Sequence, residues 1–384
     1  MWKPLHALKK TVPFLKNAKV PEGQTVFVKQ RCKYINCYIT YDRDLLRDSN
    51  QNLDAVVFNV RDIVKRSRQK KDHKLDIYPT NLKNGICIFV QVIFVNKYLQ
   101  SPEQKYIFHS LDSSDKYPVC DPFFDDFFNW TWTYKLNSVI PQTLINIYNA
   151  NKAWVGPKWN MTWVRKMTRL TRNLDRFNKK SFNKTNAVAW VIPRCKTKER
   201  YQDFINDLRS ELKSYNYSLD LYGASGNRKC PSGSIQKFLE MIEKKYFFQL
   251  VLEDAFAEDY VSERMVKALS YIVVPIVLGI SEYKSFLPPG SYLNAQSFDM
   301  KKLGAIIDYL IQHPTTYYYF FDWKNHYYYT AHPRSQMCDL CTRLNGNETT
   351  GTPTSYRHFR KWWNPDYRDA CKEMSMNNRF YKNF

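Results

Sequence analysis

The segment at residues 247–279 constrains the fold most strongly, because two apolar runs flank an amphipathic stretch there. Residues 247–252 and 273–278 are continuous apolar runs of strand length, typical of strands buried on both faces of a parallel sheet. Asp259 favours a helix N-cap, and apolar residues recur after it at helical spacing. These residues are Val261, Met265, Ala268, Leu269 and Ile272. The pattern predicts a βαβ unit within an α/β fold.

Charged residues gather where the first of these strands ends. Glu253 and Asp254 follow the strand, and Glu263 and Arg264 lie in the first part of the predicted helix. In open α/β sheets ligands bind outside the carboxyl ends of the strands, and a helix N-terminus favours an anionic group such as a diphosphate. A charged first helical turn is also commonly just a solvated cap. The charges alone therefore leave both interpretations open.

The unit as a whole matches a known pattern, in which an acidic pair is followed by Y-[VIT]-[TS]-E-[KR] and then by V-P-[IV]-V-L-G. In this chain the three parts are Glu253-Asp254, Tyr260-Val261-Ser262-Glu263-Arg264 and Val274-Pro275-Ile276-Val277-Leu278-Gly279. The ordered match resembles the donor-binding motif of the α1,3-fucosyltransferases, glycosyltransferase family 10, and an invertebrate-like member in particular.

The resemblance implies both a fold and a reaction. The fold is α/β with GT-B architecture, in which two Rossmann-like domains face each other across a cleft. The reaction is inverting transfer of fucose from GDP-fucose to an N-acetylglucosamine hydroxyl of a glycoprotein glycan, in α1,3 linkage and without a metal or other cofactor. Glu253, Asp254 and Tyr260 would belong to the nucleotide site. Glu263 would hold the ribose hydroxyls, and Arg264, where the family usually has Lys, would meet the diphosphate.

Arg200 is the second basic residue expected at the donor. It ends a loop at 193–200 that follows a predicted strand at 188–192 and is similar to the family's S-N-C loop, which ends in a phosphate-binding Arg. The guanidinium fork can contact two phosphate oxygens at once, which a Lys cannot do. A solvated Arg on a first helical turn is the alternative that the resemblance argues against.

Asp112 is the candidate general base. A predicted strand ends at residues 107–108, and the chain then turns through 109–114, where the family carries E-S-P with its presumed catalytic carboxylate. Residues 128–134 match the family's F-N-W-T-x-[ST]-Y, but two family carboxylates beyond it are replaced by Asn137 and Val139. An acceptor hydroxyl is a poor nucleophile until a base takes its proton. We expect Asp112 to be that base, with a solvent-exposed Asp of no catalytic role as the alternative.

The predicted division of the chain has four parts. They are a stem remnant at 1–25, an acceptor-side Rossmann-like domain at 26–165, a GDP-fucose-binding Rossmann-like domain at 180–345 and a C-terminal tail at 346–384. The resemblance lapses across about 65–99, which makes this stretch a doubtful insertion, although the apolar run at 86–95 fits a core strand. A helix including residues 163–174 is expected to link the halves.

Nine cysteines and five N-x-[ST] sequons fit passage through the secretory pathway. The sequons are at Asn129, Asn160, Asn183, Asn216 and Asn347. In the family the two N-terminal cysteines join the C-terminal pair, which implies bridges Cys32–Cys338 and Cys37–Cys341. Residues 1–19 are basic and interrupted by prolines, so they form neither a signal peptide nor a membrane span. Since family members in animals carry a membrane anchor, we expect a Golgi luminal protein whose anchor is missing from this sequence.

Three other interpretations follow from charge and from departures within the motifs. The net charge of +22 attracts anionic partners, but no RNP motif or zinc-finger spacing is present, so a nucleic-acid-binding protein is a remote alternative. Substitutions in the family motifs make a pseudoenzyme that binds glycan or nucleotide the main alternative. Asp42-Arg43-Asp44 looks like a D-x-D metal motif, but it precedes a predicted strand in the acceptor half, so we expect no metal site.

Overall fold

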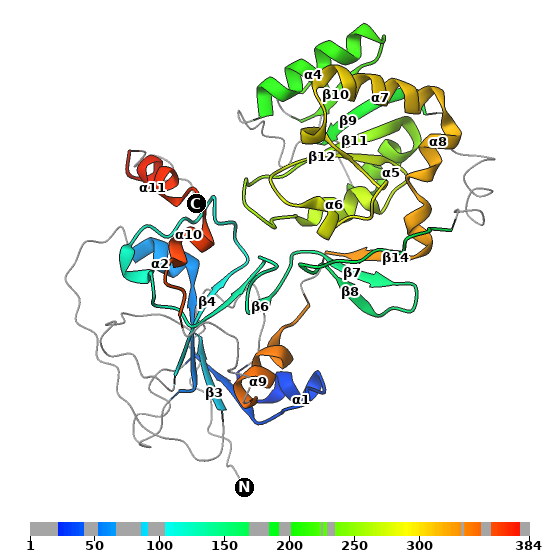
Figure 1. Cartoon of the computed structure of the whole chain (residues 1–384). Coiled ribbons are helices and arrows are strands. Elements are labelled where there is room, and N and C mark those ends of the chain that lie inside the picture. Colours follow the sequence, from blue (N-terminus) through cyan, green and yellow to red (C-terminus); the bar gives the residue numbers. More distant parts are fainter. Residues whose placement is uncertain are drawn as a thin grey trace. The chain divides into compact units, whose positions relative to one another are not determined.

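The computed structural model describes residues 22–41, 53–66, 86–90, 104–168, 184–191, 201–223, 226–228, 235–331, 334–346 and 355–376. Two compact units are present, one formed by 1–142 with 334–384 and the other by 143–333 (Figure 1). Each unit contains its own parallel sheet. This confirms the predicted α/β class with two Rossmann-like domains of the GT-B type. The predicted limits of the functional domains, 26–165 and 180–345, stay predictions.

The first unit contains a six-stranded parallel sheet in the order β1-β3-β2-β4-β5-β6. The strands are β1 (Cys37–Thr40), β2 (Ala55–Asn59), β3 (Ile86–Val90), β4 (Lys105–Ser110), β5 (Trp130–Thr133) and β6 (Ile140–Pro141). Helix α1 (Thr25–Lys29) precedes the sheet and helix α2 (Val60–Arg66) follows β2. β3 comes from the stretch where the family resemblance lapses, and it pairs with β1 on one side and β2 on the other.

The C-terminal segment returns to the first unit and is bound to it covalently. It forms helices α9 (Met337–Asn345), α10 (Phe359–Trp363) and α11 (Tyr367–Met376). The predicted disulfides Cys32–Cys338 and Cys37–Cys341 are confirmed, with Cα–Cα distances of 5.0 and 5.9 Å. A third bridge, Cys120–Cys371, which was not predicted, attaches α11.

Aromatic packing and one buried lysine hold α10 in place. The ring of Phe108 lies 4.7 Å from that of Phe359 and 4.8 Å from that of Trp363. Lys135 is buried, and its Nζ donates to the carbonyl of Trp362 at 2.7 Å. Lys135 thus binds the C-terminal segment to the first unit.

The second unit contains a five-stranded parallel sheet in the order β10-β9-β11-β12-β13. The strands are β9 (Asn186–Val191), β10 (Leu219–Tyr222), β11 (Tyr246–Leu252), β12 (Val274–Leu278) and β13 (Leu293–Asn294). The helices are α4 (Gln202–Ser214), α5 (Ile235–Lys245), α6 (Glu263–Leu269), α7 (Met300–Gln312) and α8 (Pro314–Tyr319). The predicted βαβ unit is confirmed, since β11 and β12 pair in parallel around α6.

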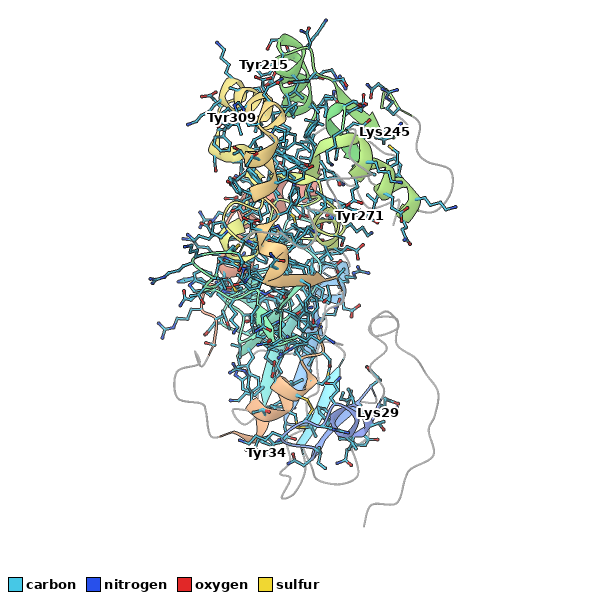
Figure 2. The ribbon with its side chains drawn as sticks, turned by 90° about the vertical axis from the view of Figure 1, so that its right-hand side faces the viewer. Lys29, Tyr34, Tyr215, Lys245, Tyr271 and Tyr309 are labelled. Atoms are coloured by element: carbon cyan, nitrogen blue, oxygen red, sulfur yellow. A yellow bond between two sulfur atoms is a disulfide. The ribbon has the colours of Figure 1, made fainter. Side chains whose placement is uncertain are left out.

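Helices α4 and α7 pack together because both have apolar stripes at helical spacing. The buried residues of the stripes are Ile205, Leu208 and Leu212 on α4 and Leu303, Ile307 and Leu310 on α7. Asp299 caps α7 by accepting from the Lys302 N–H at 2.8 Å. Gly304 permits the close approach, since a Cβ there would lie 2.5 Å from Glu211 Cγ. Figure 2 labels Tyr215, the C-cap of α4, and Tyr309 on α7.

Two helix predictions were wrong. Helix α6 begins at Glu263 with Ser262 as its N-cap, whereas the sequence predicted Asp259. Asp259 has a φ of +59°, which places it in a turn before the helix. The predicted linking helix is absent from residues 161–168, which are irregular, and its remainder lies outside the described residues. Trp163 instead donates from its ring nitrogen to the carbonyl of Lys284 at 2.7 Å.

A small antiparallel sheet completes the second unit. Its order is β14-β7-β8, formed by β7 (Asn146–Asn149), β8 (Trp154–Gly156) and β14 (Tyr327–Thr330). An aromatic block at 317–329 leads into β14, and Tyr317, Phe321 and Trp323 are buried within it. Across the ranges given above, no helix has the length and apolarity needed to cross a membrane.

Candidate active site

The strand order of the second unit singles out one place for a ligand. From β9 the chain crosses to β10 on one side, and from β11 it crosses to β12 on the other, although β9 and β11 are neighbours. Such a switch point leaves a crevice outside the carboxyl ends of the two strands, where ligands bind in open α/β sheets. Glu253 and Asp254 follow β11 directly. The predicted donor segment therefore lies at the switch point.

Arg264 is held at this edge by its neighbours. Its Nη2 lies 3.3 Å from Asp254 Oδ2, and its Nη1 donates to the carbonyl of Leu252 at 3.4 Å. The side chains of Arg264 and Asp254 are 30% and 21% exposed. The structure thus brings these two predicted residues together, with part of the guanidinium accessible to an anion.

Glu253 differs from its neighbours because it is only 1% exposed. Its Oε1 accepts the N–H of Ser262 at 3.0 Å, and its main-chain carbonyl accepts the hydroxyl of Tyr201. Oε2 has no hydrogen-bond partner among the described residues. Burial raises the pKa of Glu253 to about 7, although the hydrogen bonds from Ser262 and the charge of Arg264 act in the opposite direction.

Gly279, the last residue of the motif, is required by close packing around Glu253. A Cβ at this position would lie 2.6 Å from Tyr283 Oη and 3.4 Å from Glu253 Cγ. The hydroxyl of Tyr283 is buried, and within the described ranges it has no hydrogen-bond partner. Burial, and then the nearby Glu253 carboxylate, raise the pKa of Tyr283 well above its usual value.

The remaining predicted donor residues differ in exposure. Tyr260 is half-buried, and its carbonyl accepts the hydroxyl of Ser281 at 3.2 Å. The side chain of Glu263 is 62% exposed and lies 3.6 Å from Lys267 Nζ. Arg200 lies outside the described residues. Its neighbour Tyr201 precedes α4, and the Tyr201 ring is 5.7 Å from that of Phe256 in the donor segment.

The sheet of the first unit has a switch point of the same kind. From β2 the chain crosses to β3 on one side and from β4 to β5 on the other, and β2 and β4 are neighbours. Asp112 follows β4, and Arg61 follows β2 in the first turn of α2. Since parallel strands end at the same edge, the two side chains meet. Arg61 Nε lies 2.6 Å from Asp112 Oδ2, and Arg61 Nη2 lies 2.8 Å from Oδ1.

The main chain around Asp112 is also fixed. Ser110 Oγ accepts the N–H of Asp112 at 3.0 Å and donates to the Asp112 carbonyl at 2.8 Å. His109 is buried, and burial lowers its pKa to about 4, although the Asp112 carboxylate acts in the opposite direction. The imidazole is therefore neutral near pH 7. Its ring packs edge-on against Trp132 at 4.6 Å.

Arg61 is the residue that sequence reasoning missed. The available signal was its position just after the apolar run at 54–59, which resembles the position of Asp112 after the predicted strand that ends at 107–108. The two positions that lack the family's carboxylates, Asn137 and Val139, differ in their surroundings. Asn137 is exposed, and the N–H of Val139 donates to Thr131 Oγ1 at 3.1 Å.

No group of three or more His, Cys, Asp or Glu side chains in the described parts of the chain is placed to hold a metal ion. Asp42 and Asp44, the residues of the D-x-D sequence, lie outside those parts.

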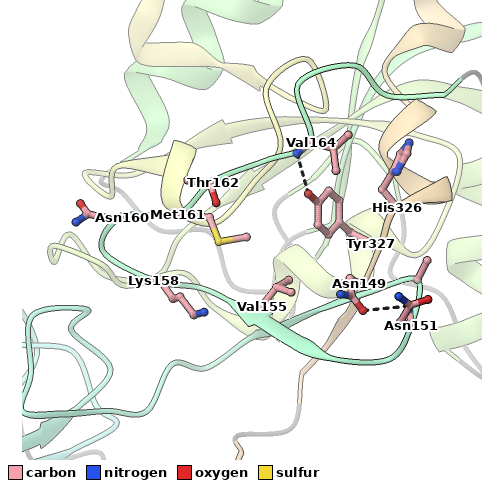
Figure 3. Close-up of a pocket in the computed structure, with 11 residues that line it drawn as sticks. Asn149, Asn151, Val155, Lys158, Asn160, Met161, Thr162, Val164, His326 and Tyr327 are labelled. Carbon is pink, nitrogen blue, oxygen red and sulfur yellow. Dashed lines mark hydrogen bonds between the residues drawn. The ribbon is translucent and has the colours of Figure 1, made fainter.

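A cavity of about 410 Å³ lies elsewhere in the second unit, beside β7 and β14 (Figure 3). Its lining includes Asn149, Lys158, Met161 and Tyr327, and none of the predicted site residues. Much of its polar lining is already engaged. Tyr327 Oη accepts the N–H of Val164 at 2.9 Å, and Asn149 Oδ1 accepts the N–H of Asn151 at 3.0 Å.

Comparison with known proteins identifies two family models that together span most of the chain. "Fucosyltransferase, N-terminal" matches residues 9–144, and "Glycosyltransferase family 10 (fucosyltransferase) C-term" matches residues 181–362. The second match contains the whole predicted donor segment.

Individual relatives support the same grouping. Alpha-(1,3)-fucosyltransferase C of Drosophila melanogaster is 29% identical over 272 residues, covering 69% of this chain and 60% of that protein. Glycoprotein 3-alpha-L-fucosyltransferase A of Drosophila melanogaster is 26% identical over 357 residues, covering 90% and 58%. The chain thus spans about three fifths of the length of these relatives. A crystal structure of an alpha1,3-fucosyltransferase with GDP-fucose aligns with a TM-score of 0.40 and 13% identity, covering 77% of this chain and 91% of that one.

Proposed function

Because this chain belongs to glycosyltransferase family 10, the fucosyltransferase family, we propose that it is an α1,3-fucosyltransferase. It transfers fucose from GDP-fucose to an N-acetylglucosamine hydroxyl of a glycoprotein glycan, with inversion at the sugar carbon and without a metal. The observation that carries the proposal is the position of the donor motif, which follows β11 at the switch point of a parallel sheet.

On the donor side, the charge that develops on the diphosphate explains why arginines belong to the site. The diphosphate gains negative charge as its bond to the sugar breaks, and fixed positive groups stabilise that charge. Arg264, partly exposed and held by Asp254, supplies one such group. Arg200, assigned by resemblance, supplies the second. Glu263 has an exposed carboxylate, which suits it to accept hydrogen bonds from the ribose hydroxyls.

Tyr260 and Asp254 complete the nucleotide site in this proposal. Tyr260 is half-buried, so its ring offers one accessible part to a ligand while the remainder is packed. Glu253 belongs to the same segment, but its buried carboxylate is bonded inward to Ser262.

On the acceptor side, Asp112 is the general base. Its carboxylate takes the proton of the acceptor hydroxyl as the new bond to the sugar carbon forms and the bond to the diphosphate breaks. The sugar carbon has oxocarbenium character at that stage. Asp112 is 26% exposed, so its carboxylate remains accessible from solvent while it is bonded to Arg61.

The proposed location is the Golgi lumen, with attachment to the membrane through an anchor. Three disulfides fit an oxidising compartment. Two sequon asparagines, Asn160 and Asn216, are exposed and suit glycan attachment. Asn129 does not, because its Oδ1 accepts the N–H of Tyr106 at 2.8 Å.

The test is a transfer assay with purified protein, GDP-fucose and a panel of N-acetylglucosamine-terminated glycans. Asp112→Asn should abolish transfer and leave GDP affinity unchanged, while Asp112→Glu should retain or raise activity. Asp115→Asn, in the same loop, is the matched control. If Asp112→Asn transfers fucose as fast as the parent, the base lies elsewhere.

The same assay separates the alternatives. A pseudoenzyme is favoured by the substitutions within the family motifs, and it predicts binding of GDP-fucose without transfer. A nucleic-acid-binding protein predicts affinity for any polyanion that falls steeply with salt.

A further inference from the structure

The contact between Arg61 and Asp112 is bidentate, which distinguishes it from an ordinary surface ion pair. Both carboxylate oxygens accept from one planar guanidinium, at 2.6 and 2.8 Å. A fork of this kind fixes the plane of the carboxylate as well as its position. Surface pairs with a single long contact leave the carboxylate free to rotate and contribute little.

Arg61 is itself oriented from several sides. Its main-chain N–H donates to Asn59 Oδ1 at 2.8 Å, which fixes the start of α2. Its guanidinium lies 5.7 Å from the centre of the Tyr117 ring. The Arg61 side chain is nevertheless 46% exposed. The pair is therefore rigid and open to solvent, unlike an ion pair buried in the core.

We propose that Arg61 is the positioning residue for the catalytic carboxylate, fixing Asp112 in the orientation in which it takes the acceptor proton. This inference rests on the proposed function and on Asp112 as its base. Asp is one methylene shorter than the Glu that the family carries at this place, so its reach depends on a fixed orientation. Misplacement by about 1 Å can reduce a rate about a hundredfold.

Arg61 and His109 both lie beside Asp112. Arg61 contacts it from α2, and His109 faces it from β4. His109 is neutral near pH 7, since burial lowers its pKa to about 4. The hydrogen bond to Asp112 raises the pKa of Arg61 above its usual value, and Tyr117 and Asp62 act in the same direction. Arg61 is therefore the charged side chain whose contact orients the Asp112 carboxylate.

The experiment measures kcat and the acceptor KM for fucose transfer in the parent, Arg61→Ala and Arg61→Lys. Arg61→Ala should lower kcat about 10- to 100-fold and leave the acceptor KM nearly unchanged, because the carboxylate is still present but is no longer oriented. Arg61→Lys can keep one contact but loses the fork, so it should recover only part of the kcat that Arg61→Ala loses. The dissociation constant for GDP should not change in either variant.

Arg334→Ala is the matched control, because it breaks another partly exposed Arg–Asp pair in the same unit, with Asp339 at 3.0 Å. If both Arg61 variants lose kcat equally, and only as much as their loss of folded protein accounts for, Arg61 is a structural strut and the inference is overturned. Unchanged kcat in Arg61→Ala overturns it as well. Absence of transfer by the parent itself is a different outcome, since it overturns the proposed function on which the inference depends.

Discussion

In the parent, the free energy of unfolding of the second unit should fall as the pH rises, and Glu253→Gln should remove this fall. The amide oxygen of Gln can still accept the N–H of Ser262, so the contact between the end of β11 and the start of α6 is kept. What the variant removes is the buried charge. Glu253 is 1% exposed, and its Oε2 has no partner within the described ranges to offset ionisation.

The size of the effect follows from the pKa of Glu253, which burial raises from 4.5 to about 7. A folded-state pKa above the unfolded value gives stability that is fully present below pH 4.5 and is lost as the pH rises through about 7. Each pKa unit corresponds to about 1.36 kcal/mol, so the whole loss is roughly 3.4 kcal/mol. Between about pH 5 and about pH 8.5 the change is roughly 2.5 kcal/mol.

The assay is denaturant-induced unfolding of parent and variant at these two pH values. Relative to the parent, Glu253→Gln should gain roughly 2.5 kcal/mol of unfolding free energy at the higher pH. Glu258→Gln, which removes an exposed carboxylate from the same segment, is the control. If the unfolding free energies of Glu253→Gln and the parent differ by the same amount at both pH values, the buried carboxylate of Glu253 does not ionise over this range and the reasoning is refuted.

Three further predictions concern single contacts. Arg264→Ala and Arg200→Ala should each weaken GDP binding by about 1.5–3 kcal/mol in calorimetry, while Arg264→Lys should retain part of the affinity. Unchanged GDP affinity in either alanine variant would show that the replaced arginine is not in the donor site. Gly279→Ala should lower the unfolding free energy by about 1–3 kcal/mol, because the added methyl group meets a tyrosine hydroxyl, and an unaltered denaturation midpoint would contradict the packing. Replacing Cys120 and Cys371 by Ser should cost about 2–4 kcal/mol of stability, and peptide mapping without reduction should find this bridge in the parent.

The parts of the fold that were predictable are those with a strong local signal. The apolar runs that form β11 and β12 predict strands because they are short and continuous, and the run of β12 is rich in β-branched residues. The start of α6 was misplaced because several residues in that segment favour an N-cap. The choice of Ser262 depends on a distant carboxylate, since Glu253 accepts its N–H.

The contact between Arg61 and Asp112 was not predictable for a different reason. It exists because β2 and β4 are neighbours in the sheet while β3 pairs on the other side of β2. Strand order is a property of the folded sheet, and no local pattern contains it. The third disulfide, Cys120–Cys371, likewise depends on the C-terminal segment returning to the first unit.

The most direct test of the central claim is an NMR time course of purified protein with GDP-fucose and an N-acetylglucosamine-terminated acceptor, in the presence of a metal chelator. The account predicts one molecule of GDP released for each fucosylated product, with an anomeric configuration opposite to that of the donor. Retained configuration, dependence on a divalent metal, or GDP released without any fucosylated product would contradict it.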